Sequence, residues 1–330
     1  MSKDIAVIGS GGWGTAAAVH LNKLGHKVSL WSWLKEESDT LRRELENKQF
    51  LPGVTLPSDI VFTDDISCVE GKDLVVLVTP SKAIRSTAYS MSPYVSKDTV
   101  VVILSKGIED KTLKTLSDVV IEEIPQAKIA VMSGPSHAEE VARGIPTTNI
   151  AACEDISGAK LVQSVFNGET FRVYTGTDVL GVELGGALKN VIALCAGVLD
   201  GLGYGDNTKA ALMTRGIKEI ASLGIKMGAS AETFWGLSGI GDLIVTCTSM
   251  HSRNRRAGIL IGKGKTPHEA IAEVNMVVEG IVNCNAAYEL SKKYNVDMPI
   301  ITQAYNVLNN GKDPGEAVKD LMIRSGKQEF

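Results

Sequence analysis

The chain has 330 residues, of which 44% are hydrophobic and 22% are charged, and its formal net charge is −4 at pH 7. This length is too great for one ordinary core and predicts two domains, and the composition is typical of a soluble globular protein. The acidic balance argues against a nucleic-acid-binding protein.

Five cysteines are scattered along the chain with no CxxC spacing. Such spacing is typical of reduced thiols in a cytoplasmic protein, so we expect neither a disulfide framework nor a zinc site. An apolar strand begins by Ile5 without a preceding basic segment, and we therefore expect no signal peptide. No uninterrupted apolar run reaches the length of about 18 residues that a membrane span needs, which predicts no membrane-spanning segment.

The first 31 residues predict a nucleotide-binding unit. Residues 4–8 form an apolar strand, residues 15–24 an alanine-rich helix and residues 27–31 a second strand. Between the first strand and the helix lies a GxGxxG pattern formed by Gly9, Gly11 and Gly14. Glycines at these positions allow a tight turn and a close approach of a pyrophosphate to the helix N-terminus. This order of elements predicts a dinucleotide site.

Further apolar, β-branched runs predict strands over residues 73–79, 99–104, 128–132 and 171–174. Such runs are typical of parallel strands that are covered by helices on both faces. From about residue 178 the chain changes to long segments rich in Ala, Gly and Leu that predict helices. We therefore expect an α/β fold: a Rossmann domain with a mostly parallel sheet over residues 1–178, and an all-α domain over residues 179–330.

Two polar loops follow predicted strands and are expected to meet at the carboxyl edge of the sheet, where ligands bind in such folds. Lys106 follows the strand over 99–104, and its alternative interpretation is a solvated loop lysine. Ser136 follows the strand over 128–132. Its spacing to Glu139 predicts a capping box at a helix start, a role compatible with substrate contact. His137 is not expected to be catalytic.

Lys189 lies on a predicted helix, four and three residues after Gly185 and Gly186. Each glycine weakens a helix by roughly 1 kcal/mol relative to alanine. This cost is explained if a ligand approaches the backbone beside the ammonium, and the alternative is close helix packing with a solvated lysine. A lysine in a dry pocket, or near a second cation such as Lys106, is suited to proton transfer near neutral pH.

Two other polar groups stand out in the second half of the chain. Asp242 lies in an otherwise apolar segment, and Ser252 is expected to cap a helix whose first turn contains Arg253 and Asn254. A first-turn arginine is unfavourable to the helix dipole unless an anion binds there, so this position predicts a phosphate site. The following residues 255–256 are expected to form a solvated basic face.

Eight motifs occur in order across nearly the whole chain: SGGWGTA, LPG after Phe50, SKGIE, SGPSHAEEV, GVELGGALKN, GLGYGDN, GIGDLIVTCTS and HSRNRRAG. On these motifs the chain resembles the bacterial-type NAD(P)-dependent glycerol-3-phosphate dehydrogenases. The resemblance implies a C-terminal domain like that of 6-phosphogluconate dehydrogenase and interconversion of dihydroxyacetone phosphate and sn-glycerol 3-phosphate. It also implies a cytoplasmic homodimer at the first committed step toward glycerophospholipids.

The matching motifs imply roles for individual residues. Lys189 is implied as the proton donor and acceptor at the C2 oxygen, with Lys106 and Asp242 as further catalytic residues. Substrate contacts are implied for Lys106, Gly134, Ser136, Lys189, Asn190, Asp242, Thr246, Ser252, Arg253 and Asn254. Cofactor contacts are implied for Gly9, Gly11, Gly12, Trp13, Gly14, Trp33, Phe50, Lys106, Ala138, Arg253, Val277 and Glu279. No metal site is implied.

The chain departs from this family at two places. Gly12 stands where the family commonly has serine or alanine. After the second strand there is neither an acidic residue for a ribose 2′-OH nor the family's frequent arginine for a 2′-phosphate, and Lys35 is the nearest substitute. The preference between NADH and NADPH therefore stays open. The alternative functions are a 3-hydroxyacid or 6-phosphogluconate-type dehydrogenase and a catalytically inactive dinucleotide sensor.

Overall fold

The structure is a computed structural model that describes residues 2–97, 99–326 and 328–329. Contacts within the chain divide it into two compact units. Unit 1 comprises residues 1–109 and 114–183, and unit 2 comprises residues 110–113 and 184–330. The domain boundary at residue 178, expected from the change in composition, stays a prediction.

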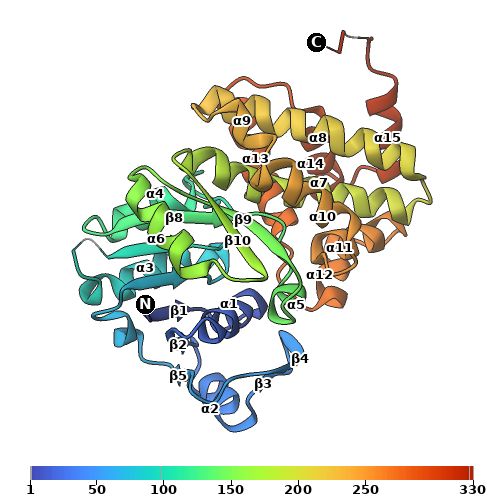
Figure 1. Ribbon diagram of the computed structural model, residues 1–330. Coiled ribbons are helices and arrows are strands. Elements are labelled where there is room, and N and C mark those ends of the chain that lie inside the picture. The colour runs from blue at the N-terminus through green and yellow to red at the C-terminus, as the bar shows by residue number, and fades with distance from the viewer. Residues whose placement is uncertain (1, 98, 327, 330) are drawn as a thin grey trace. The chain divides into compact units, whose positions relative to one another are not determined.

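Unit 1 is built on an eight-stranded sheet (Figure 1). In chain order its strands are β1 (Asp4–Ile8), β2 (Lys27–Trp31), β5 (Val61–Thr63), β6 (Leu74–Leu77), β7 (Val100–Ile103), β8 (Lys128–Ser133), β9 (Thr147–Cys153) and β10 (Phe171–Gly176). In space their order is β10-β9-β8-β7-β6-β1-β2-β5. A separate two-stranded sheet pairs β3 (Glu46–Asn47) with β4 (Leu51–Thr55). The Rossmann-like N-terminal fold expected from the sequence is confirmed.

The sheet is parallel except where β8 and β9 pair antiparallel. All six strands expected from apolar runs are present, and β9 and β5 were not predicted. In β9 the sequence TTNIAAC begins with polar residues, and two of its first four side chains are only half-buried. An uninterrupted apolar run, the signal of a fully covered parallel strand, is therefore absent from this strand.

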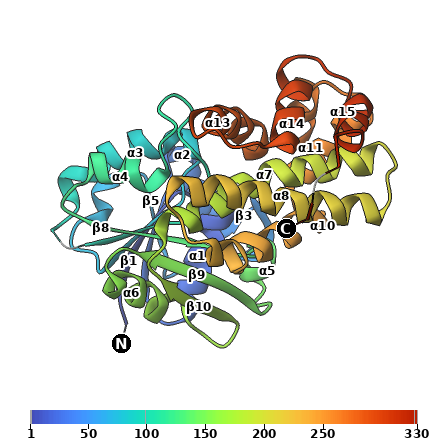
Figure 2. The ribbon, with the colours of Figure 1, turned by 90° about the horizontal axis from the view of Figure 1, so that it is seen from above.

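Helices cover both faces of the sheet (Figure 2). Alternate side chains of β1 show this directly, because Ile5 and Val7 belong to one core cluster, whereas Ala6 and Ile8 belong to the other. The first cluster includes α1 and α6, and the second includes α3 and α4. The helices of unit 1 are α1 (Gly12–Lys23), α2 (Lys35–Glu44), α3 (Ile84–Met91), α4 (Leu116–Glu123), α5 (Ala138–Ala142) and α6 (Ile156–Phe166). Short 3₁₀ helices span Ile66–Val69, Ser81–Ala83 and Ser92–Tyr94.

Unit 2 contains only helices and loops in the part that the structure describes, as expected. It begins within α7 (Val179–Gly201), whose first residues belong to unit 1. The other helices are α8 (Asp206–Met227), α9 (Ala231–Phe234), the π-helical turn Leu237–Gly241, α10 (Asp242–Thr248), α11 (Arg253–Gly262), α12 (Pro267–Val274), α13 (Glu279–Lys293), α14 (Pro299–Asn309) and α15 (Pro314–Met322).

Glycines let α7 and α11 pack backbone against backbone. A Cβ atom on Gly197 would lie 2.0 Å from the carbonyl oxygen of Arg255, and one on Gly258 would lie 2.0 Å from that of Leu194. Small residues spaced four apart on both helices permit such an approach. The packing brings the start of α11, with its arginine, toward the part of α7 that follows Lys189.

α7 is the one helix in the described ranges that is long and apolar enough to cross a membrane, with a mean hydropathy of 1.6 over 18 residues. Glu183 and Lys189 interrupt its apolar sequence, so it contains no uninterrupted apolar run of about 18 residues. In the structure 78% of this window is buried inside the protein, which is the burial of a core helix.

Candidate active site

The glycine-rich loop joins β1 to α1 and is shaped for a pyrophosphate. Gly9 has a φ of +122°, and a Cβ on Gly14 would lie 1.9 Å from the carbonyl oxygen of Gly9, so both positions require glycine. A Cβ on Gly11 would meet nothing within 4 Å. Gly11 is the N-cap of α1 and makes no side-chain cap bond, so the start of the helix offers backbone N–H groups to an anion. These residues fit a dinucleotide.

Three predicted cofactor residues meet at the first turn of α1. A Cβ added to Gly12 would lie 2.7 Å from the carbonyl oxygen of Phe50 and 3.8 Å from the Cβ of Ala138. The structure thus explains why glycine replaces serine or alanine at position 12: the backbone of Phe50 lies too close for a side chain. Trp13, the next residue, stacks on Phe171 with ring centroids 6.5 Å apart.

The loops after β7 and β8 meet at the carboxyl edge of the sheet, as expected. Lys106 donates a hydrogen bond from Nζ to the carbonyl oxygen of Gly134 at 3.3 Å. Gly134 has a φ of +151°, and a Cβ there would clash with Asn149 of β9. Asn149 in turn lies 3.4 Å from the hydroxyl of Ser136. The edge therefore presents a lysine, a hydroxyl and a bare backbone together.

The predicted capping box at Ser136 is wrong. The helix that follows, α5, is five residues long and has His137 as its N-cap, with no side-chain cap bond. Ser136 instead donates its hydroxyl to the carbonyl oxygen of Gly134 at 3.0 Å. The hydroxyl of Ser136 therefore does not cap the helix, which starts one residue later than the spacing predicts.

Lys189 lies in a buried polar cluster within unit 2. Its side chain is 7% exposed, and Nζ donates to Asp242 Oδ1 at 2.6 Å and to Thr246 Oγ1 at 2.5 Å. The hydroxyl of Thr246 also donates to the backbone carbonyl of Asp242, one turn earlier on α10, at 2.6 Å. The ammonium is therefore held by a carboxylate and a hydroxyl on one helix, in surroundings with little water.

The surroundings of Lys189 combine burial with a nearby carboxylate. The burial agrees with a dry pocket, but the close charged group is the carboxylate of Asp242, which favours the charged ammonium. The proximity of Lys106 to Lys189 stays a prediction. Solvation of Lys189, the alternative interpretation, does not occur.

Gly185 explains how Asp242 reaches the lysine. A Cβ on Gly185 would lie 2.7 Å from the carbonyl oxygen of Ser238, in the π-helical turn that leads into α10. The close-packing interpretation is therefore correct for Gly185. Because this turn rests against the backbone of α7, the next residues place the carboxylate beside Lys189.

The predicted phosphate site begins at Ser252, whose hydroxyl caps α11 by accepting the backbone N–H of Arg255 at 3.2 Å. Asn254 is buried in the first turn, where it donates to Asn190 Oδ1 at 2.9 Å and accepts from the N–H of Gly280 at 2.8 Å. The amide of Asn254 thus joins α7 and α11 to the start of α13. This arrangement fixes the first turn that carries Arg253.

The expected solvated basic face after Asn254 is wrong for Arg255. Its Nε donates to Asp200 Oδ2 at 2.7 Å, and both side chains are about 15% exposed. Asp200 also pairs with Lys209 at 2.5 Å. This ion-pair network fixes the end of α7 to α8 and α11, so Arg255 is structural.

The remaining predicted cofactor residues lie in both units. Trp33 follows β2 and is 72% exposed, with its ring edge-on to Trp31. Lys35 is exposed at the start of α2, where Glu36 and Glu37 follow it in the first turn. In unit 2, Val277 is half-exposed and Glu279 is the first residue of α13.

Two sequence profiles match this chain. Residues 4–159 match the N-terminus, and residues 178–319 the C-terminus, of NAD-dependent glycerol-3-phosphate dehydrogenase. The chain belongs to this family. A glycerol-3-phosphate dehydrogenase (NAD(P)+) from Fusobacterium nucleatum is 55% identical over 329 residues, which cover 99% of this chain and 98% of that protein. Another, from Agathobacter rectalis, is 55% identical over 326 residues, which cover 98% of this chain and 97% of the relative.

A crystal structure of the dehydrogenase from Coxiella burnetii matches with a TM-score of 0.94 and 37% identity, over 98% of this chain and 99% of that one. The full-length agreement confirms the resemblance inferred from the eight motifs. It favours this family over the 3-hydroxyacid and 6-phosphogluconate-type alternatives, and it supports the oxidoreductase function and the use of NAD(P).

Sequence reasoning missed several residues that build the site of this family member. Asn149 supports Ser136, and the glycine pairs of α7 and α11 place Arg253. The glycine pairs have a readable signal, because Gly197 and Gly201, like Gly258 and Gly262, are four residues apart. Asn149 has no such signal in the sequence, because its role depends on the antiparallel pairing of β8 with β9.

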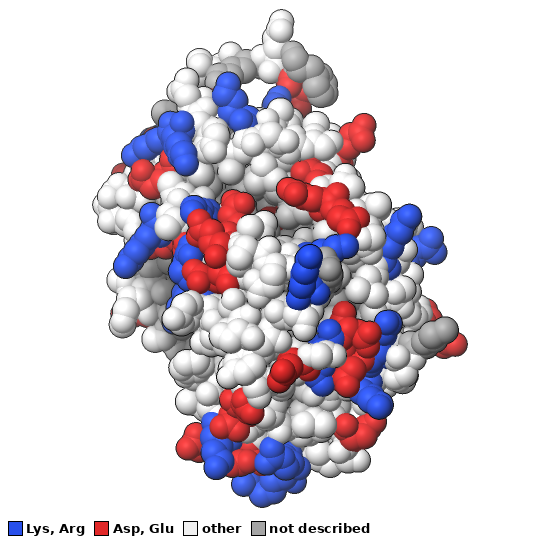
Figure 3. Space-filling model, turned by 90° about the vertical axis from the view of Figure 1, so that its left-hand side faces the viewer, with Lys and Arg blue, Asp and Glu red and all other residues white. Residues whose placement is uncertain are grey.

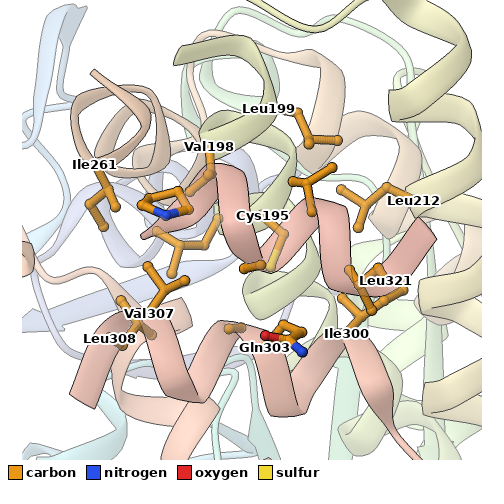
Figure 4. Close-up of a pocket in the computed structure, with 15 residues that line it drawn as sticks. Cys195, Val198, Leu199, Leu212, Ile261, Ile300, Gln303, Val307, Leu308 and Leu321 are labelled. Atoms are coloured by element: carbon orange, nitrogen blue, oxygen red, sulfur yellow. The ribbon is translucent and has the colours of Figure 1, made fainter. Parts of the chain in front are cut away.

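Other parts of the described chain do not suggest a second catalytic site. No group of three or more His, Cys, Asp or Glu side chains among the described residues is placed to hold a metal ion. A cavity of about 60 Å³ in unit 2 is lined by aliphatic side chains of α7, α8, α11, α14 and α15, with Cys195 and Gln303 (Figure 4). None of the predicted site residues lines it.

On the face drawn in Figure 3, acidic and basic side chains are interspersed.

Proposed function

We propose that this chain interconverts dihydroxyacetone phosphate and sn-glycerol 3-phosphate with NADH or NADPH. The observation that carries the proposal is the buried cluster of Lys189, Asp242 and Thr246 in a member of this dehydrogenase family. When bound, NADH or NADPH would supply the hydride for reduction of the ketone. The protein must then supply one proton to the C2 oxygen.

Lys189 is the group that we assign to this proton. Its ammonium donates to the developing alkoxide in reduction, and the neutral amine accepts the proton again in oxidation. Asp242 and Thr246 hold Nζ in one position, since both accept its hydrogen bonds. The carboxylate of Asp242 keeps the ammonium charged until the alkoxide develops, and the hydroxyl of Thr246 orients it.

We assign the phosphate of the substrate to the first turn of α11. Ser252, Arg253 and Asn254 lie there, and the N-terminus of a helix together with a guanidinium suits a dianion. The bond between Asn254 and Asn190 ties this turn to α7, the helix that carries the proposed proton donor. This link supports a substrate whose phosphate and carbonyl are recognised by the same pair of helices.

In unit 1, we assign the cofactor to the glycine-rich loop and the residues around Gly12. The residues with this role are Gly9, Gly11, Gly12, Trp13, Gly14, Trp33, Phe50 and Ala138, with Arg253, Val277 and Glu279 from unit 2. Lys106, Gly134 and Ser136 at the adjoining sheet edge are assigned to the substrate, and Lys106 also to the cofactor. The hydrogen bond between Lys106 and Gly134 supports grouping these residues.

The resemblance further supports a cytoplasmic homodimer whose product feeds glycerophospholipid synthesis. Sedimentation equilibrium of the purified protein tests the oligomeric state, and we expect twice the monomer mass. A single species at the monomer mass would refute the dimer without affecting the proposed reaction.

The decisive experiment follows the oxidation of NADH and NADPH by absorbance with dihydroxyacetone phosphate as substrate. We expect turnover with dihydroxyacetone phosphate, very poor turnover with unphosphorylated dihydroxyacetone, and none with 3-hydroxyacids or 6-phosphogluconate in the reverse direction. Binding of NADH without turnover of any of these compounds would instead favour the inactive dinucleotide sensor.

A further inference from the structure

Asn47 is a buried amide beside the glycine-rich loop. It is 4% exposed and lies at the end of β3, in the hairpin whose second strand, β4, packs against α1 and α5 (Figure 1). Its Nδ2 donates to the carbonyl oxygen of Ser10 and to the hydroxyl of Thr15, both at 2.8 Å. Its Oδ1 accepts the backbone N–H of Phe50 at 3.1 Å.

These bonds close a network around the start of α1. The hydroxyl of Thr15 donates to the same carbonyl of Ser10 at 3.1 Å, and Thr15 is fully buried. Both protons of the Asn47 amide and its oxygen are engaged within the protein. Asn47 is therefore placed to hold the loop and not to contact a ligand.

The network connects the hairpin of β3 and β4 to the glycine-rich loop and the start of α1, which lie more than 30 residues earlier in the sequence. Ser10 belongs to the glycine-rich loop, Thr15 to the first turns of α1, and Phe50 to the loop between β3 and β4. Phe50 also approaches Gly12, with its carbonyl oxygen 2.7 Å from the position that a Cβ would take. The hairpin of β3 and β4 thus contacts the phosphate-binding backbone at two places, through Asn47 and through Phe50.

We propose that Asn47 is a positioning residue of the cofactor site, which holds the Ser10 carbonyl and the start of α1 in the binding arrangement before the dinucleotide arrives. A segment with four glycines among residues 9–14 has many accessible backbone conformations. If only a fraction of molecules has the binding arrangement, the apparent Kd increases by the reciprocal of that fraction. Asn47 keeps this fraction near one.

The test is Asn47→Ala, which removes all three bonds. We expect the Kd of NADH, measured by its fluorescence in a titration of the full-length protein, to increase at least tenfold. At saturating NADH, kcat and the KM for dihydroxyacetone phosphate should stay within threefold of the native values, since the residues assigned to substrate and proton transfer are unchanged. Thermal unfolding without ligand is recorded in parallel.

Asn283→Ala is the matched control. Asn283 is fully buried in unit 2, where its Nδ2 donates to the carbonyl oxygen of Ala187 at 3.2 Å. This variant should also unfold at a lower temperature, but its Kd for NADH should stay within twofold of the native value. Equal increases of Kd in both variants would show that general destabilisation, and not loop positioning, weakens cofactor binding.

Thr15→Val is a second, milder variant in case Asn47→Ala does not fold. It keeps the side-chain shape and removes the hydroxyl that joins Asn47 to Ser10, so we expect the Kd of NADH to increase threefold to tenfold. A Kd within twofold of native in the variant that folds would overturn the role of Asn47. A native protein that binds no NADH would instead refute the proposed function itself.

Discussion

Lys189 is the residue on which the proposed chemistry depends. Burying an ammonium is costly unless it is paired and hydrogen-bonded, and here Asp242 and Thr246 satisfy both conditions. Two of its three N–H donors are directed at these residues. A lysine held in this way is suited to moving one proton at one position.

Replacing this lysine removes the proton donor but not the cofactor site. Lys189→Met should lower kcat at least a hundredfold, which is the usual range for losing a general acid. The Kd of NADH should change less than twofold because the glycine-rich loop lies in unit 1. Steady-state kinetics and fluorescence titration measure both quantities, and a variant with more than a tenth of native kcat would refute the assignment.

Arg253 is the residue that we expect to bind the phosphate of the substrate. A charge-assisted hydrogen bond to a phosphate contributes about 1.5–3 kcal/mol, so Arg253→Ala should increase the KM for dihydroxyacetone phosphate about tenfold to a hundredfold. Turnover of unphosphorylated dihydroxyacetone should hardly change. Equal loss with both substrates would mean that Arg253 acts structurally or only on the cofactor.

At the scale of helices, close backbone packing places the catalytic groups. Gly185→Ala should move the π-helical turn away from α7, because a Cβ would lie 2.7 Å from a backbone oxygen that has no flexible side chain to yield. The distance between Asp242 and Lys189 should then increase. We expect kcat to decrease at least tenfold, as measured at saturating substrates.

Gly201→Ala is the matched control on the same helix. Its Cβ would lie 2.4 Å from the carbonyl oxygen of Ile259, at the C-terminal end of α7 and away from Lys189 in the middle of the helix. Both variants should lose stability in thermal unfolding, but only Gly185→Ala should lower kcat. Gly201 packs against α11, which carries the proposed phosphate-binding residues, so any effect of Gly201→Ala on the site should appear in the KM for dihydroxyacetone phosphate. A similar decrease of kcat in both would contradict the specific role of Gly185.

A buried carboxylate connects two further helices of unit 2. Glu219 on α8 accepts the backbone N–H groups of Ile300 and Ile301 at the start of α14, at 2.9–3.2 Å. Burial raises the pKa of Glu219 to about 8, and the two backbone hydrogen bonds oppose this shift. Because the folded pKa exceeds the unfolded value, the protonated carboxyl stabilises the fold most below about pH 4.5, and this stability is lost as pH increases through about 8.

Glu219→Gln should remove this pH dependence, because the amide stays neutral. Between pH 6 and pH 9 we expect the native Tm to decrease by about 3–6 °C more than that of the variant, from a difference of about 1–2 kcal/mol. Glu269→Gln is the control: this exposed glutamate caps α12, its backbone and hydroxyl bonds to Thr266 lower its pKa, and it does not titrate in this range. Parallel Tm curves for native protein and Glu219→Gln would contradict the prediction.

At the scale of the whole molecule, the net charge of −4 does not attract anionic ligands over long distances. Discrimination between NADH and NADPH must therefore come from local charges near the end of β2. Lys35 is exposed there, and an exposed lysine–phosphate contact contributes only about 1 kcal/mol. Glu36 and Glu37 directly follow it and limit its attraction for a 2′-phosphate.

We accordingly expect the protein to use both cofactors, with kcat/KM values within about thirtyfold of each other, as a weak exposed ion pair allows. The value for NADPH should decrease faster as salt is added, because salt screens exposed charges. Lys35→Glu should shift the ratio toward NADH by adding a repulsion. Strict use of one cofactor, unchanged by this substitution, would place the discrimination elsewhere, for example at Trp33 or Glu279.

Local patterns in the sequence were sufficient to predict the fold of each of the two domains and to identify the family. Uninterrupted apolar runs identified strands that are buried on both faces, and the GxGxxG pattern identified the phosphate loop, because each depends on residues that are neighbours in the chain. The cap at Ser252 was found for the same reason. The capping box at Ser136 was not formed, because the serine hydroxyl donates to the carbonyl oxygen of Gly134 and the helix has His137 as its N-cap.

Only the tertiary structure decided which distant residues meet. Asp242 pairs with Lys189 across 53 positions of the chain, and Asn47 reaches Ser10 across 37. Both contacts depend on how closely two backbones approach, which is set by a glycine facing a particular carbonyl oxygen in another segment. The approach of two distant backbones produces no pattern among neighbouring residues in the sequence. The sequence therefore predicted which residue types form the site, whereas tertiary packing determined which of them pair.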